Sequence, residues 1–264
     1  MAQVTRRPSA WAWVWLVIWA VFSWLPLVAT LDFSLRARKG MLSLKAYQNI
    51  FADPGFYNSL AFSFQMALLT IVISIFLVVP TAYWVHLRLR RARPLVEFVT
   101  LLPFVVPAVV IAFGLIRWYC CPPFAFVSSP LLLVAGYVVL SLPYMYRAAD
   151  TGLRAIDVCT LTEAAQSLGA SNLQTFFLVI LPNLRASILS GAFLTFAIVM
   201  GEFTLSSLLA WPAFGPYMQY VGVFKAYESA ALAIISFALT WLVMLLMLWL
   251  VRGWAAARAV TAPR

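Results

Sequence analysis

Six long runs of apolar residues divide the chain, separated by short segments rich in arginine, proline and polar side chains. A hydrocarbon core about 30 Å thick needs roughly 20 apolar residues in helical form to cross it, and each run has about that length. Because the backbone finds no water to bond inside lipid, each run is expected to be an α-helix. The runs are residues 10–31, 60–85, 95–116, 131–149, 188–210 and 231–251.

Prolines interrupt two of these runs. Pro103 and Pro107 lie within one expected helix, and Pro80 lies near the inner end of another. A proline removes a backbone donor and bends the helix that contains it. Such a bend is either a static kink stabilised by packing or a point where helices move, and the sequence leaves both open.

The segment between the fourth and fifth runs, residues 150–185, is polar yet has helical signals. Thr160 and Glu163 have the spacing of a capping box, which predicts a helix beginning at Thr160. Gly169 is placed to end this helix in a left-handed conformation. The pattern predicts a short helix followed by a sharp turn.

A second short helix is predicted directly after this turn. Ser171 and Gln174 have the spacing of another capping box, and Pro182 is expected to end the helix. The hairpin exposes apolar surface unless it folds back on the membrane helices or docks into a partner, and the residues alone favour neither. The apolar face consists of Phe176, Phe177, Ile180 and Leu181.

The amino-acid composition supports the interpretation of these runs as membrane helices. Hydrophobic residues make up 64% of the 264 residues, charged residues 10%, and the mean hydropathy is +0.96. Too few charges are present to cover a soluble surface, so the chain is expected to be all-α and polytopic in lipid. The net charge of +10 does not indicate nucleic-acid binding, because the basic residues lie between apolar runs. The three cysteines have no metal-ligand spacing.

The distribution of positive charge predicts the orientation. Cytoplasmic loops carry the excess of lysine and arginine, and twelve of the 18 basic residues fall on one side of the predicted helices. Both termini are therefore expected to be cytoplasmic. The first run is too long for the apolar part of a signal peptide, so it is expected to be retained. The cytoplasmic set is Arg6, Arg7, Arg88, Arg90, Arg91, Arg93, Arg147, Arg154, Arg185, Arg252, Arg258 and Arg264; the external set is Arg36, Arg38, Lys39, Lys45, Arg117 and Lys225.

Glu202 is an acidic residue inside a predicted span, with Thr204 and Ser206 close by. A charge at membrane depth costs roughly 2–3 kcal/mol or more, so it should face protein or a water-filled path. These residues either line a translocation pathway that accepts a cationic substrate or bond to a neighbouring helix or a second subunit.

The polar segment resembles the EAA motif of binding-protein-dependent ABC importer permeases. The family pattern reads EAA-x3-G-x9-I-x-LP, and only one position departs from it, by one methylene. Similar features extend along the chain, including Tyr47, Pro80, Pro103 and Pro107, and the nearest subgroup is the spermidine/putrescine-type permeases. The matching residues are Glu163, Ala164, Ala165, Gly169, Val179, Leu181 and Pro182.

The resemblance implies a transport subunit of a bacterial inner membrane rather than an enzyme. The EAA segment would be a coupling helix that docks on a dimer of ATPase subunits. This chain has no phosphate-binding G-x-x-x-x-G-K-[ST] loop, so ATP and Mg²⁺ would bind to that partner. In this role Glu163 would contact the ATPase or cap the helix, Ala164 and Ala165 would allow close approach, and Gly169 would form the turn.

The family layout also implies further partners and boundaries. A second permease, forming a heterodimer, and a periplasmic or lipid-anchored solute-binding protein are expected, with a polyamine or another small solute as substrate. Residues 1–9 and 253–264 would be cytoplasmic termini around a six-helix domain at 10–252. The family core would cover 59–251 and the coupling segment 150–185.

Two other classes of protein are alternatives. An intramembrane enzyme needs a convergent catalytic set, and His86 is the only histidine, beside an arginine cluster at the expected headgroup level. An ion-coupled secondary transporter needs its own coupling-ion site, for which Glu202 is the candidate. Uptake that is sensitive to an uncoupler rather than to ATP depletion would favour the second class.

Overall fold

The computed structural model describes residues 10–37, 41–120 and 126–261. The regular structure in these ranges is helical, apart from one isolated bridge between Arg36 and Ser43. Five of the described helices are long and apolar enough to cross a membrane, and a bent pair supplies a sixth span if it is counted as one. The five are α1 (Ala10–Leu35), α3 (Pro54–Leu87), α6 (Pro130–Ala155), the helix of residues 172–201 that ends as α9 (Leu181–Gly201), and α12 (Ala226–Thr261).

The predicted all-α, polytopic fold is thus confirmed, while several boundaries differ. The last helix continues to Thr261, ten residues beyond the predicted end of its apolar run. Of the basic residues used to predict the orientation, Arg6, Arg7, Arg38, Lys39 and Arg264 lie outside the described residues.

The third predicted span is not one helix. A short 3₁₀ turn, η1 (Arg90–Ala92), leads into α4 (Arg93–Val105), and α5 (Ala108–Tyr119) follows at an angle of 99°. The first helix ends at Val105, where the next residue, Val106, is extended with a ψ of 118°, and Pro107 follows directly before α5. Pro103 lies inside α4. Of the two prolines, Pro107 marks the bend, because its ring prevents the preceding residue from staying helical.

The chain forms two compact units. The first consists of Met1–Pro54 and Met218–Leu239. It contains the short helix α2 (Lys45–Ala52), whose Asn49 amide donates to the Glu228 carboxylate at 2.8 Å. Stacked rings of Phe33 and Tyr227, with centroids 4.8 Å apart, add a second contact within this unit.

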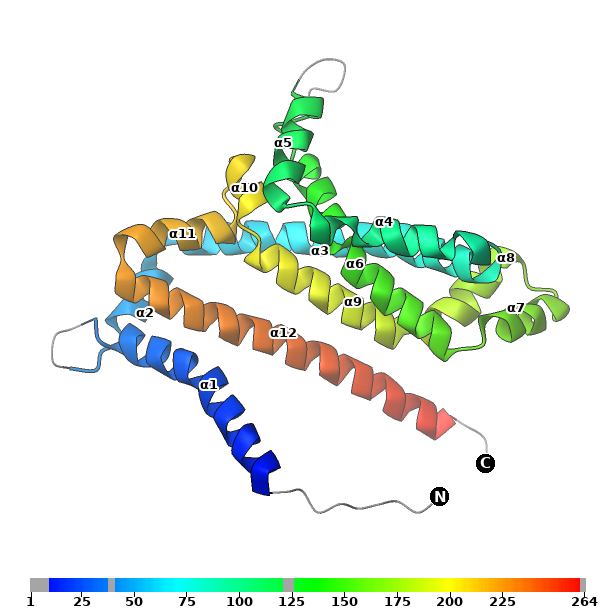
Figure 1. Ribbon diagram of the computed structural model, residues 1–264, viewed down its shortest axis with the longest axis horizontal. Helices are drawn as coiled ribbons and strands as arrows, with labels where there is room; N and C mark the ends of the chain where they lie inside the picture. Colours follow the sequence, from blue (N-terminus) through cyan, green and yellow to red (C-terminus); the bar gives the residue numbers. More distant parts are fainter. Residues whose placement is uncertain (1–9, 38–40, 121–125, 262–264) are drawn as a thin grey trace. The chain divides into compact units, whose positions relative to one another are not determined.

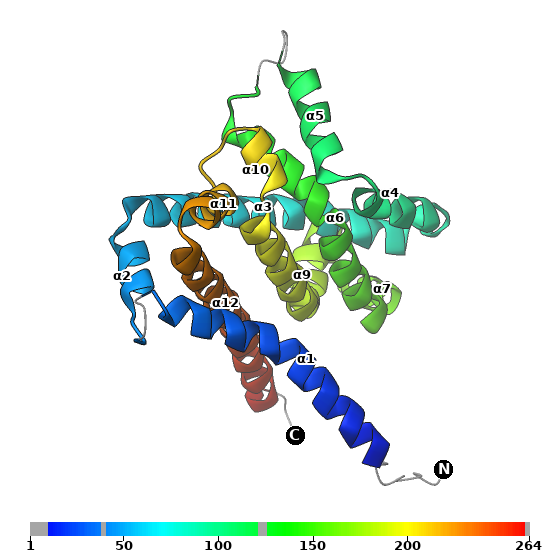
Figure 2. The ribbon, with the colours of Figure 1, turned by 60° about the vertical axis from the view of Figure 1, so that its left-hand side comes forward.

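The second unit consists of Gly55–Tyr217 and Thr240–Arg264, and α6 and α9 lie side by side in it (Figures 1 and 2). Glycines bring the two helices together. A Cβ added to Gly152 would lie 2.5 Å from the Ser187 hydroxyl oxygen, and one added to Gly191 would lie 2.9 Å from the Met145 sulfur. Small residues at a crossing let helix backbones approach closely in a membrane.

The fifth predicted span also differs from the structure. The helix ends at Gly201 rather than continuing to residue 210, and α10 (Thr204–Leu208) follows after a two-residue break. Figure 2 shows α10 beside α5, and α11 (Phe214–Phe224) comes next along the chain. Phe62 stacks on Trp211 at 5.6 Å between centroids, and Ser63 accepts the backbone N–H of Phe214 at 2.7 Å. These contacts attach the turn after α10 to α3.

Candidate coupling site and the polar cluster beside it

The first helix of the polar segment, α7 (Val158–Ser167), begins two residues before Thr160, its predicted start. Asp157 is its N-cap, and the carboxylate accepts the Thr160 backbone N–H at 3.2 Å and the Thr160 hydroxyl at 2.7 Å. The prediction that Thr160 caps the helix with Glu163 is therefore wrong, because the Asp157 carboxylate accepts the Thr160 N–H that the Glu163 side chain would bond in a capping box, and the Thr160 hydroxyl donates to the same carboxylate. The hydrogen bond from the Thr160 hydroxyl lowers the pKa of Asp157 below its ordinary value.

The turn after α7 has the predicted conformation. Gly169 has a φ of +86°, in the left-handed region. Its N–H donates to the Gln166 carbonyl at 2.9 Å, and the Ala170 N–H donates to the Ala165 carbonyl at 3.1 Å. This pair of bonds is the Schellman motif. The predicted capping box of Ser171 and Gln174 is also confirmed.

The second helix does not end at Pro182. Helix α8 (Asn172–Gln174) continues through a π-helical stretch, η2 (Thr175–Ile180), directly into α9. Pro182 lies in the first turn of α9. A π-helical stretch is wider than an α-helix and breaks its i→i−4 pattern, so a proline that follows it meets less conflict with the preceding turn. The outer hairpin and the membrane helix are therefore continuous.

The hairpin has one buried and one exposed face. Thr162 and Ala165 of α7 are buried. The Tyr83 hydroxyl of α3 lies 3.4 Å from the Thr162 hydroxyl, and the rings of Tyr83 and Phe176 are 5.3 Å apart. The inner face therefore packs against the end of α3, and Figure 1 shows α7 at the end of α6 as well.

The outer face is exposed, and it carries three leucines that no described residue covers. Leu168 is 90% exposed, Leu173 71% and Leu178 72%. Glu163 and Ala164 are exposed on α7. The remaining motif residues, Val179, Leu181 and Pro182, are half-buried. The sequence left open whether the hairpin folds back on the membrane helices or docks into a partner. Folding back covers the inner face of the hairpin and leaves the outer face exposed.

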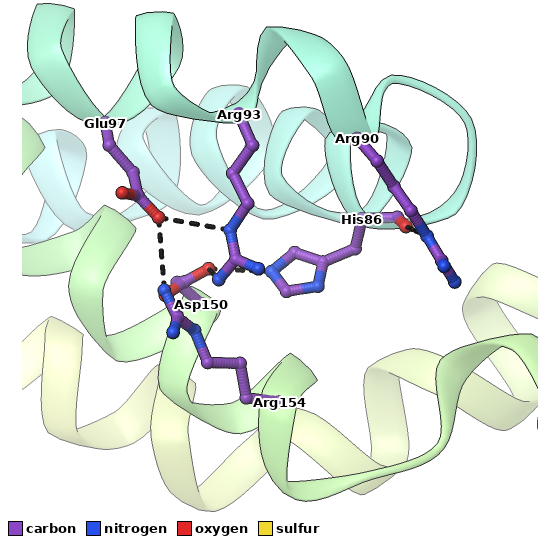
Figure 3. A network of polar contacts seen from close by, with 6 residues as sticks. All are labelled: His86, Arg90, Arg93, Glu97, Asp150 and Arg154. Atoms are coloured by element: carbon purple, nitrogen blue, oxygen red, sulfur yellow. Dashed lines mark hydrogen bonds and ion pairs between the residues drawn. The ribbon is translucent and has the colours of Figure 1, made fainter.

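Beside this hairpin lies a group of charged side chains centred on Asp150 (Figure 3). Asp150 lies in the second-last turn of α6 and is 8% exposed. Its Oδ1 atom is 2.7 Å from the His86 Nε2 atom of α3 and accepts from Arg93 of α4 at 2.8 Å. Its Oδ2 atom accepts from Arg154, one turn further along α6, at 2.7 Å. One buried carboxylate thus joins three helices.

Glu97 of α4 closes this group into a ring. Its Oε1 atom accepts from Arg93 and from Arg154, each at 3.1 Å, so both arginines bridge the same two carboxylates. We call His86, Arg93, Glu97, Asp150 and Arg154 the Asp150 cluster. The two carboxylates and the two guanidinium groups balance in charge, which is how charged groups are retained at a low-dielectric boundary.

Sequence reasoning missed the Asp150 cluster. His86 was expected beside the arginine cluster at the headgroup level, without a carboxylate partner, and Glu97, which falls within the predicted run 95–116, was given no role. Part of the signal was readable, because Arg93 with Glu97, and Asp150 with Arg154, have the i,i+4 spacing of helical ion pairs. The contact between His86 and Asp150 joins positions 64 apart, which no local pattern reports.

Glu202 stands at the break between α9 and α10. Its carboxylate accepts the backbone N–H groups of Leu205 at 2.7 Å and Ser206 at 3.2 Å, and the residue is 9% exposed. Ser206 is buried and Thr204 is half-buried. Gly215 packs so closely here that a Cβ would collide with the Glu202 carbonyl oxygen. The structure brings the three predicted pathway residues together around one bend of the backbone.

These features define a helical membrane protein with a polar hairpin between two of its candidate spans. Residues 78–256 match the family model of the "Binding-protein-dependent transport system inner membrane component". This match covers more than half of the chain, and the chain belongs to that family.

Two relatives with similar sequences and one solved structure with a similar fold serve as comparisons for this chain. The spermidine/putrescine transport system permease protein PotB of Escherichia coli is 28% identical over 216 residues, covering 74% of this chain and 77% of PotB. The molybdate/tungstate transport system permease protein WtpB of Pyrococcus furiosus is 27% identical over 216 residues, covering 81% and 85%. A bacterial ABC transporter that imports the acidic polysaccharide alginate has the same fold, with a TM-score of 0.70, 13% identity, and coverage of 90% and 92%.

The chain is therefore a multi-pass inner-membrane permease subunit of an ABC importer, and a transport subunit rather than an enzyme. The family membership sets aside the ion-coupled secondary transporter. The cytoplasmic position of both termini remains a prediction from charge.

Proposed function

We propose that residues 157–182 form the surface through which this permease docks on its ATPase. The observation that carries the proposal is the exposed apolar face of Leu168, Leu173 and Leu178 on a hairpin that is capped at both helix starts. Leu168 lies in the turn before the candidate span of residues 172–201, and Leu173 lies in the first turn of that span. Exposed apolar side chains grouped at the end of a span, on a hairpin that projects from it, mark a protein interface. The glycine turn and the caps hold the face in one shape, which lowers the entropy cost of docking.

The motif residues have distinct places in this proposal. Glu163 and Ala164 are exposed and would lie at the ATPase surface, whereas Ala165 is buried and would let α7 sit close to α3. Gly169 would form the turn, and Val179, Leu181 and Pro182 would carry the movement into α9. ATP and Mg²⁺ would be held by the ATPase dimer.

Co-purification tests the docking surface. The chain is expressed with its neighbouring candidate ATPase genes, extracted in mild detergent, and assayed for the ATPase that remains bound. Leu173→Ser and Gly169→Asp should each reduce retention about tenfold or more, because each removes or distorts an exposed interface anchor. Leu95→Ser is the matched control, since Leu95 is 65% exposed but lies on α4. Equal retention in all four proteins would contradict the proposal.

The substrate belongs to this proposal as well. We infer a small solute delivered by a periplasmic or lipid-anchored binding protein, with spermidine and putrescine as the first candidates. The resemblance to polyamine permeases and the similarity to PotB support this order. The similarity to WtpB makes oxyanions of opposite charge the second class to test. A second, similar permease would complete the pathway as a heterodimer.

The bend around Glu202, Thr204 and Ser206 is the proposed pathway segment of this chain. Irregular backbone at membrane depth is tolerated only where protein buries it or where it lines a water-filled cavity, and the two-residue break after Gly201 is such a place. Uptake of labelled spermidine and of molybdate by wild type and Glu202→Gln tests this role. If the variant leaves both uptake rates and their ratio unchanged, these residues have no part in the pathway.

A further inference from the structure

Two side-chain contacts join the coupling hairpin to the helices that the Asp150 cluster holds. Arg90, in η1 directly before α4, donates to the Cys159 sulfur of α7 at 2.9 Å and to the His86 carbonyl at 3.3 Å. Tyr83, one turn before His86 on α3, contacts Thr162 of α7. The hairpin is thus attached by side chains to α3 and η1, and by the chain itself to α6.

The Asp150 cluster in turn fastens these three attachment points to one another. Asp150 and Arg154 belong to the last two turns of α6. Their partners lie at the C-terminal end of α3 and in the first turns of α4, and we call these three helix ends the inner ends (Figure 3). Without the cluster, α7 would still be bound to each helix, but among the described residues no ion pair would join α3, α4 and α6 to one another.

We propose that Asp150 is a positioning residue that makes the inner ends of α3, α4 and α6 move as one block with the coupling helix. This inference rests on the proposed docking function. In this block, a displacement of α7 by the ATPase shifts η1 and α3 together with it, and the contact between Arg90 and Cys159 survives the movement. Once the cluster is removed, α7 moves with the ATPase while η1 stays behind, and that contact opens.

Cys159 is a natural reporter of this contact. The chain contains three cysteines, and replacing Cys120 and Cys121 by serine leaves Cys159 as its one thiol. The alkylation rate of Cys159 by N-ethylmaleimide is measured by mass spectrometry in the complex with its ATPase, once without nucleotide and once trapped with ADP and vanadate. This readout needs no transported substrate.

The test variant is Asp150→Leu with Arg154→Leu. It removes one negative and one positive charge and leaves Arg93 paired with Glu97. Because the buried Asp150 and its exposed partner Arg154 are removed together, no unpaired charge is left in the buried site, and proteins often tolerate such a replacement by apolar side chains. His86→Leu is the second variant. It removes the contact between Asp150 and α3 and keeps the ion pairs of Asp150 with Arg93 and Arg154. Arg147→Gln is the matched control, because Arg147 is exposed one turn before Asp150 and has no ion pair with a described residue.

In wild type and Arg147→Gln we expect trapping to leave the alkylation rate of Cys159 unchanged. In the double variant, trapping should raise it about fivefold or more, since local opening exposes the thiol, and His86→Leu should show a smaller rise. A double variant that behaves like wild type, or a wild type whose rate rises on trapping, would overturn the inference. If the double variant does not retain the ATPase, His86→Leu decides by the same measurement. Loss of the ATPase from wild type itself would instead refute the docking function, and this inference with it.

Discussion

Gly169 offers a clean perturbation of the coupling hairpin, because its replacement tests backbone conformation alone. Its φ of +86° lies in the region that residues with a Cβ rarely adopt, and a Cβ added there would meet no atom within 4 Å. Gly169→Ala therefore introduces no collision inside this chain. The expected cost is the conformational one, about 1 kcal/mol.

This cost is local and should appear as faster opening of the hairpin. A destabilisation of about 1 kcal/mol corresponds to a roughly fivefold increase in the exchange rate of amides whose protection depends on the turn. Hydrogen exchange measured by mass spectrometry on the purified permease, without the ATPase, should show this increase over residues 158–174. Peptides from α6 and from the later part of α9 should exchange as in wild type.

Asparagine separates backbone strain from contact with the partner. Asn adopts the left-handed conformation more readily than Ala does, so Gly169→Asn should exchange at a rate between those of wild type and Gly169→Ala. ATPase retention should follow the same order. If the Asn and Ala variants exchange equally fast, or if neither differs from wild type, the assignment of this cost to the backbone is refuted.

Three further predictions concern the rest of the second unit. Gly152→Val should lower the thermal transition in detergent by the equivalent of about 1–3 kcal/mol, because the new Cβ would lie 2.5 Å from the Ser187 hydroxyl oxygen. Gly114→Ala, where the added Cβ would meet no atom within 4 Å, should change the transition by less than half as much. Ala210→Gly should raise the same transition by the equivalent of about 0.5–1 kcal/mol, since Ala210 has a φ of 56° and the relief exceeds the entropy that glycine adds to the unfolded chain; a lower transition would contradict this. The lowered pKa of Asp157 keeps the capping carboxylate ionised at and above neutral pH, and its stabilisation of α7 is lost only as pH falls through that lowered pKa. ATPase retention should therefore stay constant between about pH 6 and 8. A loss of retention at the acidic end of that range would show that a group other than Asp157 causes it.

The membrane architecture and the turn of the hairpin were predictable from sequence because both depend on local rules. An apolar run of about 20 residues is expected to be helical where lipid surrounds it, because its backbone polar groups find no other partners there. A glycine followed by a serine and a glutamine three residues later specifies a turn and a cap within one short stretch, and the structure has both at Gly169 and Ser171. The family motif likewise lies within 20 consecutive residues.

The local rules for helix starts and ends gave a wrong prediction at three points, because neighbouring residues changed the outcome. Asp157 is the cap in place of Thr160, since its carboxylate accepts both the Thr160 N–H and the Thr160 hydroxyl. Pro182 did not end its helix, because a π-helical stretch precedes it. The helix before Glu202 ended early, where the Glu202 carboxylate bonds to backbone N–H groups that a continuous helix would have used.

The sequence by itself determined that this protein crosses the membrane, which segment projects from it, and which family it resembles. Only the tertiary structure decided which polar residues meet: His86 with Asp150, Tyr83 with Thr162, and Arg90 with Cys159. These pairs lie 64 to 79 positions apart, and they form because helix packing brings the C-terminal ends of α3 and α6 and the first turns of α4 together around one buried carboxylate. Helical periodicity reports which face of a helix is apolar, but it carries no information on which other helix that face will meet.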